Sequence, residues 1–107
     1  MMVKQREGTA LKASDIPPGT CKSGVADGQS VAIFNVDGTL YATQAECTHM
    51  GGPLCEGTLS GEIVICPWHG SEFSVRTGEV ITDPATRPLK TYQVSVQQDG
   101  VITISET

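Results

Sequence analysis

Apolar and polar residues alternate along several short stretches of the chain, a pattern typical of β-strands that bury one face. Residues 30–36 and 39–43 are read as two strands on either side of Asp37-Gly38, a dipeptide favoured in tight hairpin turns. The same arrangement recurs near the end of the chain, where a second Asp-Gly pair separates residues 91–96 from residues 101–104. The pattern therefore predicts two antiparallel hairpins.

Shorter apolar stretches lie between these hairpins. Residues 62–65 lead directly into Cys66, and residues 72–75 and 79–81 flank Thr77-Gly78, which predicts another turn. Helical periodicity does not extend beyond about two turns anywhere in the chain. The 12 glycines and 6 prolines also favour many turns and short strands. We therefore expect an all-β fold with an antiparallel sandwich or barrel-like core.

The length of 107 residues suits one compact domain, which we expect to span residues 1–107. Hydrophobic residues make up 38% of the chain and aromatic residues 5%. The core should therefore be modest and built mainly from Val, Ile and Leu. In a domain of this size, a bound metal centre can contribute usefully to folding.

The formal net charge is −5, which argues against a nucleic-acid partner because such a protein normally carries a basic patch. Two explanations of the acidity stay open. It favours docking onto a basic protein partner, and it also keeps a small domain in solution.

The charged start of the chain, Met1 to Glu7, is not followed by an apolar run, and no stretch approaches the roughly 20 apolar residues that span a bilayer. We therefore expect a cytoplasmic protein with no membrane partner. The four cysteines allow a disulfide framework in principle. We expect none, because two of the cysteines lie close to histidines and no secretion signal is visible.

The strongest chemical signal is a pair of short segments, Cys47-Thr48-His49 and Cys66-Pro67-Trp68-His69. Sixteen residues separate them, and both histidines of the chain belong to the pattern. Each segment offers one thiolate and one imidazole. Glycines between the segments, at Gly51, Gly52, Gly57 and Gly61, allow the chain to reverse and bring the two segments together.

Three interpretations of these segments compete. The first is coincidence, with no metal bound. The second is a structural zinc site, since zinc accepts two cysteines and two histidines, although such sites more often use a close cysteine pair followed by a close histidine pair. The third is a [2Fe–2S] cluster with cysteine ligands on one iron and histidine ligands on the other, so that each segment supplies one ligand to each iron.

The two segments with their flanking residues, 47–57 and 66–73, resemble the two halves of the Rieske motif. Residues 83–89 resemble the proline loop that covers the cluster in the Rieske family. The resemblance spans roughly Leu11 to Ile104 and implies stacked antiparallel sheets with the cluster-binding loops at one tip. It also implies one [2Fe–2S] cluster per chain, with four ligands: Cys47, His49, Cys66 and His69.

Departures from one branch of the family bear on the reduction potential. The respiratory branch has a disulfide between the two loops, and its cysteine positions correspond here to Gly52 and Trp68. A tyrosine that donates to a ligand sulfur in that branch corresponds to Phe73, whereas Ser71 stands where a serine donates to a bridging sulfide. With one donor kept and one absent, we expect a potential in the lower part of the Rieske span of about −150 to +300 mV.

Two cysteines fall outside the ligand positions of this pattern. Cys55 lies between the motif halves and is expected to be a spectator thiol, and Cys21 is expected to take part in packing.

The resemblance implies a stand-alone electron carrier rather than an enzyme. Its partners would be a flavin-dependent ferredoxin reductase and a terminal oxygenase that hydroxylates an aromatic ring or a similar substrate. The alternative is a small subunit of a larger redox enzyme, such as a nitrite-reductase-like assembly. The Rieske domain of an oxygenase itself is not expected, because no histidine is left for a separate catalytic iron site.

Overall fold

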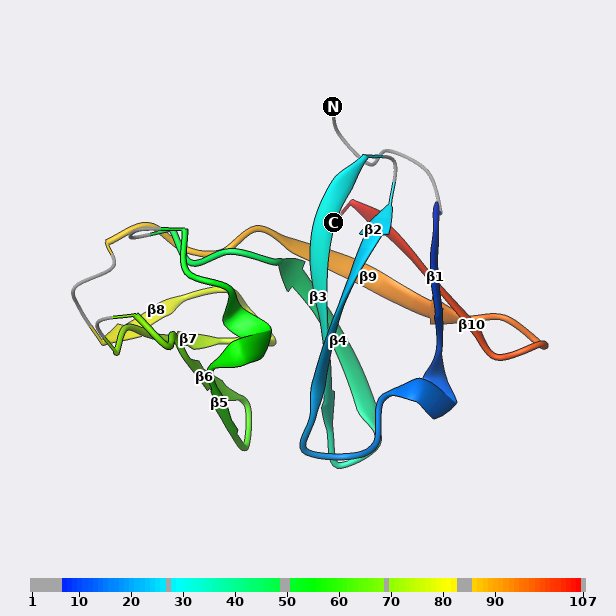
Figure 1. Ribbon diagram of the computed structural model, residues 1–107, viewed down its shortest axis with the longest axis horizontal. Helices are drawn as coiled ribbons and strands as arrows, with labels where there is room; N and C mark the ends of the chain where they lie inside the picture. Colours follow the sequence, from blue (N-terminus) through cyan, green and yellow to red (C-terminus); the bar gives the residue numbers. More distant parts are fainter. Residues whose placement is uncertain (1–6, 27, 49–50, 69, 83–85, 107) are drawn as a thin grey trace.

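The computed structural model describes residues 7–26, 28–48, 51–68, 70–82 and 86–106, and strands dominate these ranges (Figure 1). This confirms the all-β prediction. None of the helices in these ranges is long and apolar enough to cross a membrane. The elements are β1 (Glu7–Lys12), η1 (Ala13–Asp15), β2 (Cys21–Ala26), β3 (Gln29–Val36), β4 (Thr39–Gln44), η2 (Leu54–Glu56), β5 (Thr58–Ser60), β6 (Ile63–Ile65), β7 (Glu72–Ser74), β8 (Val80–Thr82), β9 (Thr91–Val96) and β10 (Val101–Glu106).

The larger of two sheets in the described ranges has six strands in the order β1-β10-β9-β4-β3-β2, and each pairing between neighbours is antiparallel. The predicted hairpins are β3–β4 and β9–β10, and β4 pairs with β9 through Ala42 and Tyr92. The sheet curls so that its two edges approach each other. A methyl group at Gly24 of β2 would lie 3.1 Å from the Leu11 side chain of β1.

The turn of the first hairpin has the backbone geometry that its sequence predicts. Asp37 has φ +52° and Gly38 has φ +95°. Positive φ at both central residues is the signature of the type I′ turn, whose twist matches that of the flanking strands. The side chain of Asn35 reinforces this turn, because its carbonyl oxygen accepts a 2.8 Å hydrogen bond from the Gly38 N–H.

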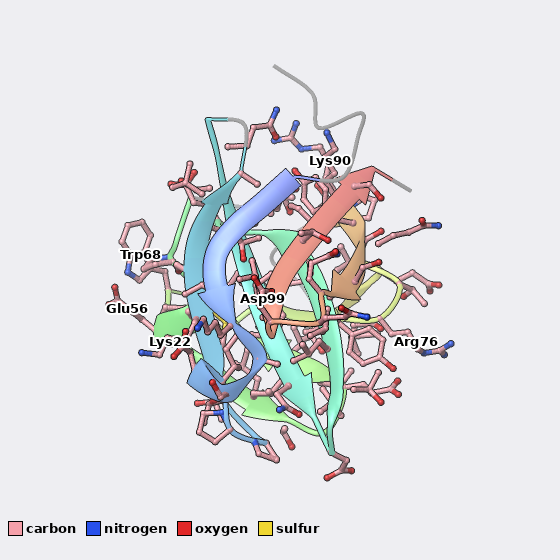
Figure 2. All side chains as sticks on the ribbon, turned by 90° about the vertical axis from the view of Figure 1, so that its right-hand side faces the viewer. Lys22, Glu56, Trp68, Arg76, Lys90 and Asp99 are labelled. Atoms are coloured by element: carbon pink, nitrogen blue, oxygen red, sulfur yellow. A yellow bond between two sulfur atoms is a disulfide. The ribbon has the colours of Figure 1, made fainter. Side chains whose placement is uncertain are left out.

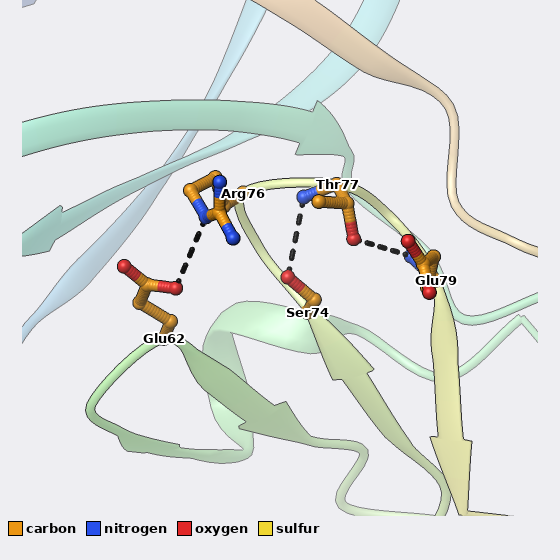
Figure 3. A network of polar contacts seen from close by, with 5 residues as sticks. All are labelled: Glu62, Ser74, Arg76, Thr77 and Glu79. Atoms are coloured by element: carbon orange, nitrogen blue, oxygen red, sulfur yellow. Dashed lines mark hydrogen bonds and ion pairs between the residues drawn. The ribbon is translucent and has the colours of Figure 1, made fainter.

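The smaller sheet has four three-residue strands in the order β5-β6-β7-β8. It lies to one side of the larger sheet in Figure 1. The β7–β8 turn is fixed by local hydrogen bonds (Figure 3): the Thr77 N–H donates to Ser74 Oγ, and the Glu79 N–H donates to Thr77 Oγ1. Arg76 in this turn forms a 3.2 Å ion pair with Glu62. The predicted turn at Thr77-Gly78 is therefore confirmed.

Strand β3 separates two apolar cores and contributes to both. Val31 and Ile33 pack inside the curled larger sheet, with residues such as Ile102 and Ile104. Ala32 and Phe34, on the opposite face, pack between the two sheets. A strand buried on both faces needs an unbroken apolar run, which explains why residues 31–34 are all apolar.

The core between the two sheets contains two of the predicted ligands. Cys47 and Cys66 belong to it, together with residues from both sheets and from the segment after β8. The other members are Ala32, Phe34, Leu54, Val64, Phe73, Val75 and Leu89. The predicted metal centre is therefore continuous with the packing that joins the two sheets.

Three strands were not anticipated from the apolar pattern: β1, β2 and β5. Each lies at the edge of its sheet. Edge strands are covered less completely, so they need fewer apolar residues. In β2, only Ala26 is buried, and alternation is too weak there to predict a strand.

The expectation that the chain forms no disulfide is wrong. Cys21 and Cys55 are joined, with their Cα atoms 5.2 Å apart. Cys21 is therefore more than a packing residue, and Cys55 is not a spectator thiol. The two cysteines are 34 residues apart, and the fold brings them together by packing the edge strand β2 against η2. No local pattern in the sequence reports such a contact.

Candidate metal centre

The predicted motif forms two loops, one from each half, and each loop is closed by an equivalent backbone hydrogen bond. The Cys47 N–H donates to the Gly52 carbonyl and the Cys66 N–H donates to the Ser71 carbonyl, both at 2.8 Å. In each case the bond joins a cysteine to the residue five positions later. The matching closure gives both loops a similar compact form, with the cysteine at its base.

Glycine makes both of these tight loops possible. Gly51 has φ +75° and Gly70 has φ +76°, a region that other residues occupy only at a cost. Gly51 also donates a backbone hydrogen bond to the Cys47 carbonyl at 3.0 Å. Of the glycines predicted to bend the chain between the cysteines, Gly51 and Gly52 lie within the first loop, whereas Gly70 of the second loop was not among them.

The two predicted cysteine ligands meet in the structure. Cys47 and Cys66 remain thiols, and each is only 3% exposed. Burial raises the pKa of the Cys66 thiol above its ordinary value, and the neighbouring Cys47 thiol raises it further through a hydrogen bond and through charge. The Trp68 backbone N–H, which bonds to the Cys66 sulfur, acts in the opposite direction on this pKa.

This pair of thiols fits the iron of a Rieske [2Fe–2S] cluster that takes two cysteine ligands. The Cys66 thiol, buried beside a second cysteine, resists ionisation because its thiolate would lack a compensating charge. A bound iron supplies that charge, so the site favours deprotonation when a metal is present. The N–H of Trp68 is then a donor to a ligand sulfur, one of the contacts that tune such clusters.

Gly52 and Trp68 are close neighbours beside the buried sulfurs. A methyl group at Gly52 would lie 2.9 Å from Cys66 Sγ and 3.1 Å from the Trp68 ring. These two positions correspond to the additional disulfide of the respiratory branch, and their proximity agrees with that correspondence. Glycine at position 52 leaves room for both the Cys66 sulfur and the Trp68 indole, and Trp68 remains 48% exposed.

The predicted histidine ligands, His49 and His69, lie outside the described residues. Within the ranges that are described, no group of three or more His, Cys, Asp or Glu residues comes together. The structure thus brings together two of the four predicted ligands.

A contact that the sequence did not predict fastens the segment after β8 to the first ligand loop. The Thr48 hydroxyl donates a 2.6 Å hydrogen bond to the Arg87 carbonyl, and an Arg87 guanidinium nitrogen donates to the Thr48 carbonyl at 3.4 Å. Leu89 is buried between the sheets, which anchors the same segment. Residues 83–85 of the predicted proline loop lie outside the described residues.

Two further residues singled out from the sequence lie in the interior beside the thiols. Ser71 and Phe73 are both fully buried, and Phe73 belongs to the same core as Cys47 and Cys66.

The sequence did not predict that the Trp68 backbone N–H donates to a sulfur. Every residue but proline carries an N–H, and only the loop conformation directs this one at Cys66.

These features define a class: a small antiparallel β protein whose two glycine-rich loops present a buried cysteine pair to a metal. The chain belongs to the Rieske [2Fe-2S] domain family, whose pattern it matches over residues 7–93. One [2Fe–2S] cluster per chain is the cofactor that this family implies, and the cysteine pair fits it.

Named relatives narrow the class. The chain is 43% identical, over 94 residues, to the biphenyl dioxygenase ferredoxin subunit of Pseudomonas sp. (strain KKS102), which covers 87% of this chain and 86% of the relative. Among solved structures, the complex of reduced oxygenase and oxidized ferredoxin in carbazole 1,9a-dioxygenase contains a chain that is 37% identical. It superposes with a TM-score of 0.83, covering 91% of this chain and 90% of that one.

A second solved structure confirms the fold at lower identity. The ferredoxin of carbazole 1,9a-dioxygenase from Nocardioides aromaticivorans IC177 is 25% identical, with a TM-score of 0.87, and covers 96% of this chain and 100% of that chain. The antiparallel all-β fold expected from the resemblance to the Rieske family is therefore confirmed.

Proposed function

We propose that this protein is the ferredoxin component of a ring-hydroxylating dioxygenase system. It accepts one electron at a time from a flavin-dependent ferredoxin reductase and passes it to a terminal oxygenase. The similarity to the biphenyl dioxygenase ferredoxin subunit over most of both chains carries this proposal. As a carrier, the protein catalyses no substrate chemistry itself.

The proposed ligands are Cys47 and Cys66 on one iron and His49 and His69 on the other. The meeting of the two buried thiols supports the sulfur half of this assignment. For the imidazole half, support comes from spacing, since each histidine lies two or three residues after a described cysteine. The cluster supplies reversible one-electron chemistry, and the chain buries the sulfurs and directs the Trp68 N–H at one of them.

Selective labelling tests the imidazole half directly. The chain has two histidines, so incorporation of ¹⁵N-histidine marks only the two proposed ligands. Pulsed EPR of the dithionite-reduced protein should then show strong couplings to two nitrogen nuclei that change with the label. Couplings that do not change with the label would exclude histidine ligation, and zinc without iron or acid-labile sulfide would exclude the cluster.

The described surface near the thiols is suited to transfer at the tip. Pro67, Trp68 and Gly70 are exposed and belong to the same loop as the buried Cys66. An electron leaving the cluster therefore has little protein to cross.

Six acidic residues lie near the motif in the sequence. Glu46, Glu56, Glu62 and Glu79 are exposed, Glu72 is partly buried and Asp83 lies outside the described residues. Glu46, Glu56 and Glu79 are placed to steer a basic partner, whereas Glu62 is already paired with Arg76.

The functional test combines this protein with the reductase and oxygenase of a biphenyl dioxygenase system under anaerobic conditions. Visible absorption should report reduction by NADH plus the reductase, then reoxidation on mixing with the oxygenase, with one electron per chain. Reduction by dithionite without exchange with either protein would contradict the proposal. A stable complex with other subunits on gel filtration would favour the alternative, a subunit of a larger redox enzyme.

We also propose three further properties. The reduction potential lies in the lower part of the Rieske span, the protein is cytoplasmic, and residues 1–107 form one domain. Phe73 offers no hydroxyl to the sulfurs, which lowers the potential relative to a tyrosine. Redox titration tests the first point, where a potential well above zero would contradict it. Cell fractionation tests the cytoplasmic location. Limited proteolysis tests the single domain and should yield one resistant fragment.

A further inference from the structure

The Cys21–Cys55 disulfide connects the two sheets of the molecule. Cys21 is the first residue of β2, at an edge of the larger sheet, and Cys55 is the central residue of η2, which precedes the smaller sheet. The polypeptide itself passes between the sheets twice, once after β4 and once before β9. The disulfide is therefore a third covalent connection, located on the opposite edge of the larger sheet from β1.

The segment held by this disulfide is the support of the first ligand loop. Leu54, next to Cys55, is buried in the same core as Cys47 and Cys66. Its N–H donates to the Ala45 carbonyl at 3.0 Å, and the preceding residue, Pro53, forms an isolated bridge with Glu46. A displacement of η2 would thus reach Cys47 through two short backbone contacts.

The disulfide is more accessible than the ligand thiols. Cys21 and Cys55 are both partly exposed, whereas Cys47 and Cys66 are each 3% exposed. The residues that follow the two disulfide cysteines, Lys22 and Glu56, are both exposed and project from the same side of the molecule in Figure 2. Thiol–disulfide exchange depends on access to the sulfurs. A small thiol can therefore react at this disulfide while the ligand cysteines stay protected.

We propose that Cys21 and Cys55 form a reversible thiol–disulfide site, separate from the cluster, that controls how firmly the cluster is retained. The co-reactant is a low-molecular-weight thiol of the glutathione class. In the reducing direction, two such thiols give up their protons and two electrons to the Cys21–Cys55 bond, which yields two cysteine thiols and one small-molecule disulfide. The oxidising direction reverses this exchange, with the small-molecule disulfide as the oxidant.

The physical basis is the freedom of the smaller sheet to move away from the larger one. Cluster loss to a chelator requires such local opening, because the ligand sulfurs are buried between the sheets. The disulfide restricts the opening at one edge, so the oxidised form should lose its cluster more slowly. The reduced form keeps the apolar core between the sheets and therefore still folds and holds a cluster.

The experiment uses the purified holoprotein, equilibrated anaerobically with reduced or oxidised glutathione. Alkylation followed by mass spectrometry counts the accessible thiols, and the decay of visible absorption in excess EDTA gives the rate of cluster loss. We expect two additional alkylated cysteines in the reduced sample, mapped to Cys21 and Cys55, and several-fold faster cluster loss.

A double variant, C21S/C55S, provides the matched control. It should lose its cluster at one rate in both glutathione samples, close to the rate of the reduced wild-type protein. This outcome separates the effect of the disulfide from any direct action of glutathione on the iron. Equal rates for oxidised and reduced wild-type protein would overturn the proposal, as would alkylation of both cysteines after exposure to oxidised glutathione.

Discussion

The two sheets differ in what stabilises them. The larger sheet is built mainly from strands of six to eight residues around a core of ordinary side chains, such as Ile33, Ile102 and Ile104. The smaller sheet has three-residue strands, and the core beneath it includes the cysteines Cys47 and Cys66. Short strands bury little surface of their own. We therefore expect the larger sheet to be maintained by hydrophobic burial, and the smaller one to depend in addition on its cluster and on covalent and backbone attachments.

Charge separates the same two regions. Residues 46–89 contain six Asp and Glu against two Arg, whereas the rest of the chain has six acidic and five basic residues. Nearly all of the net charge of −5 therefore belongs to the part that carries the ligand loops. The larger sheet and its turns are therefore almost neutral, whereas the part with the two cysteine loops carries the net negative charge.

The largest expected effect comes from removing one of the proposed cysteine ligands. C47S or C66S should abolish the cluster, since iron–sulfur clusters require thiolate ligands. Hydrogen exchange should then increase across residues 46–89 and stay low in β3, β4, β9 and β10, because those strands have their own core. Iron and acid-labile sulfide analysis with hydrogen-exchange mass spectrometry checks both parts. Uniform loss of protection in both sheets would break the comparison.

Neighbouring residues of β3 sharpen the comparison, since Ile33 and Phe34 face different cores. F34A should lower the free energy of unfolding by about 3–5 kcal/mol and I33A by about 2–5 kcal/mol. Only F34A should also speed cluster loss, because Phe34 packs in the core that contains the proposed ligands Cys47 and Cys66. Urea denaturation followed by circular dichroism, with cluster absorption in EDTA, separates the effects. The milder pair F34L and I33V serves if the alanine variants do not fold.

Two glycine-to-alanine substitutions, one in each region, compare the effect of adding a single methyl group on the free energy of unfolding. A Cβ at Gly57 would overlap the Ile65 carbonyl, whereas a Cβ at Gly8 of β1 would meet open space. G57A should therefore lower the free energy of unfolding by about 1–3 kcal/mol, because the backbone must move. G8A should change it by less than about 0.5 kcal/mol. Equal effects in denaturant titration would contradict the tight approach of these two segments.

The smallest effect is expected for the ion pair between Arg76 and Glu62. Both side chains are well exposed, at 60% and 46%, so solvent screens their attraction. R76Q and E62Q should each change the free energy of unfolding by less than about 1 kcal/mol. The matched variant T77V should have a comparable or larger effect, since it removes the acceptor for the Glu79 N–H in the β7–β8 turn. Thermal unfolding of the three variants checks this order.

Local patterns in the sequence determined the features that depend on only a few neighbouring residues. Apolar strand patterns and the Asp-Gly turns predicted both hairpins, and the paired Cys and His segments predicted the Rieske family and its [2Fe–2S] cofactor. These signals are strong because a half-buried strand, a type I′ turn and a metal ligand each constrain residue type within a few positions.

Only the tertiary structure decided which distant segments meet. The Cys21–Cys55 disulfide, the contact between Thr48 and Arg87, and the edge strands β1 and β2 all depend on how the chain folds back on itself. The Trp68 N–H likewise becomes a donor to Cys66 only through the loop conformation. Such contacts join residues that impose no pattern on their sequence neighbours, so they follow from the packing of the two sheets rather than from any short stretch of sequence.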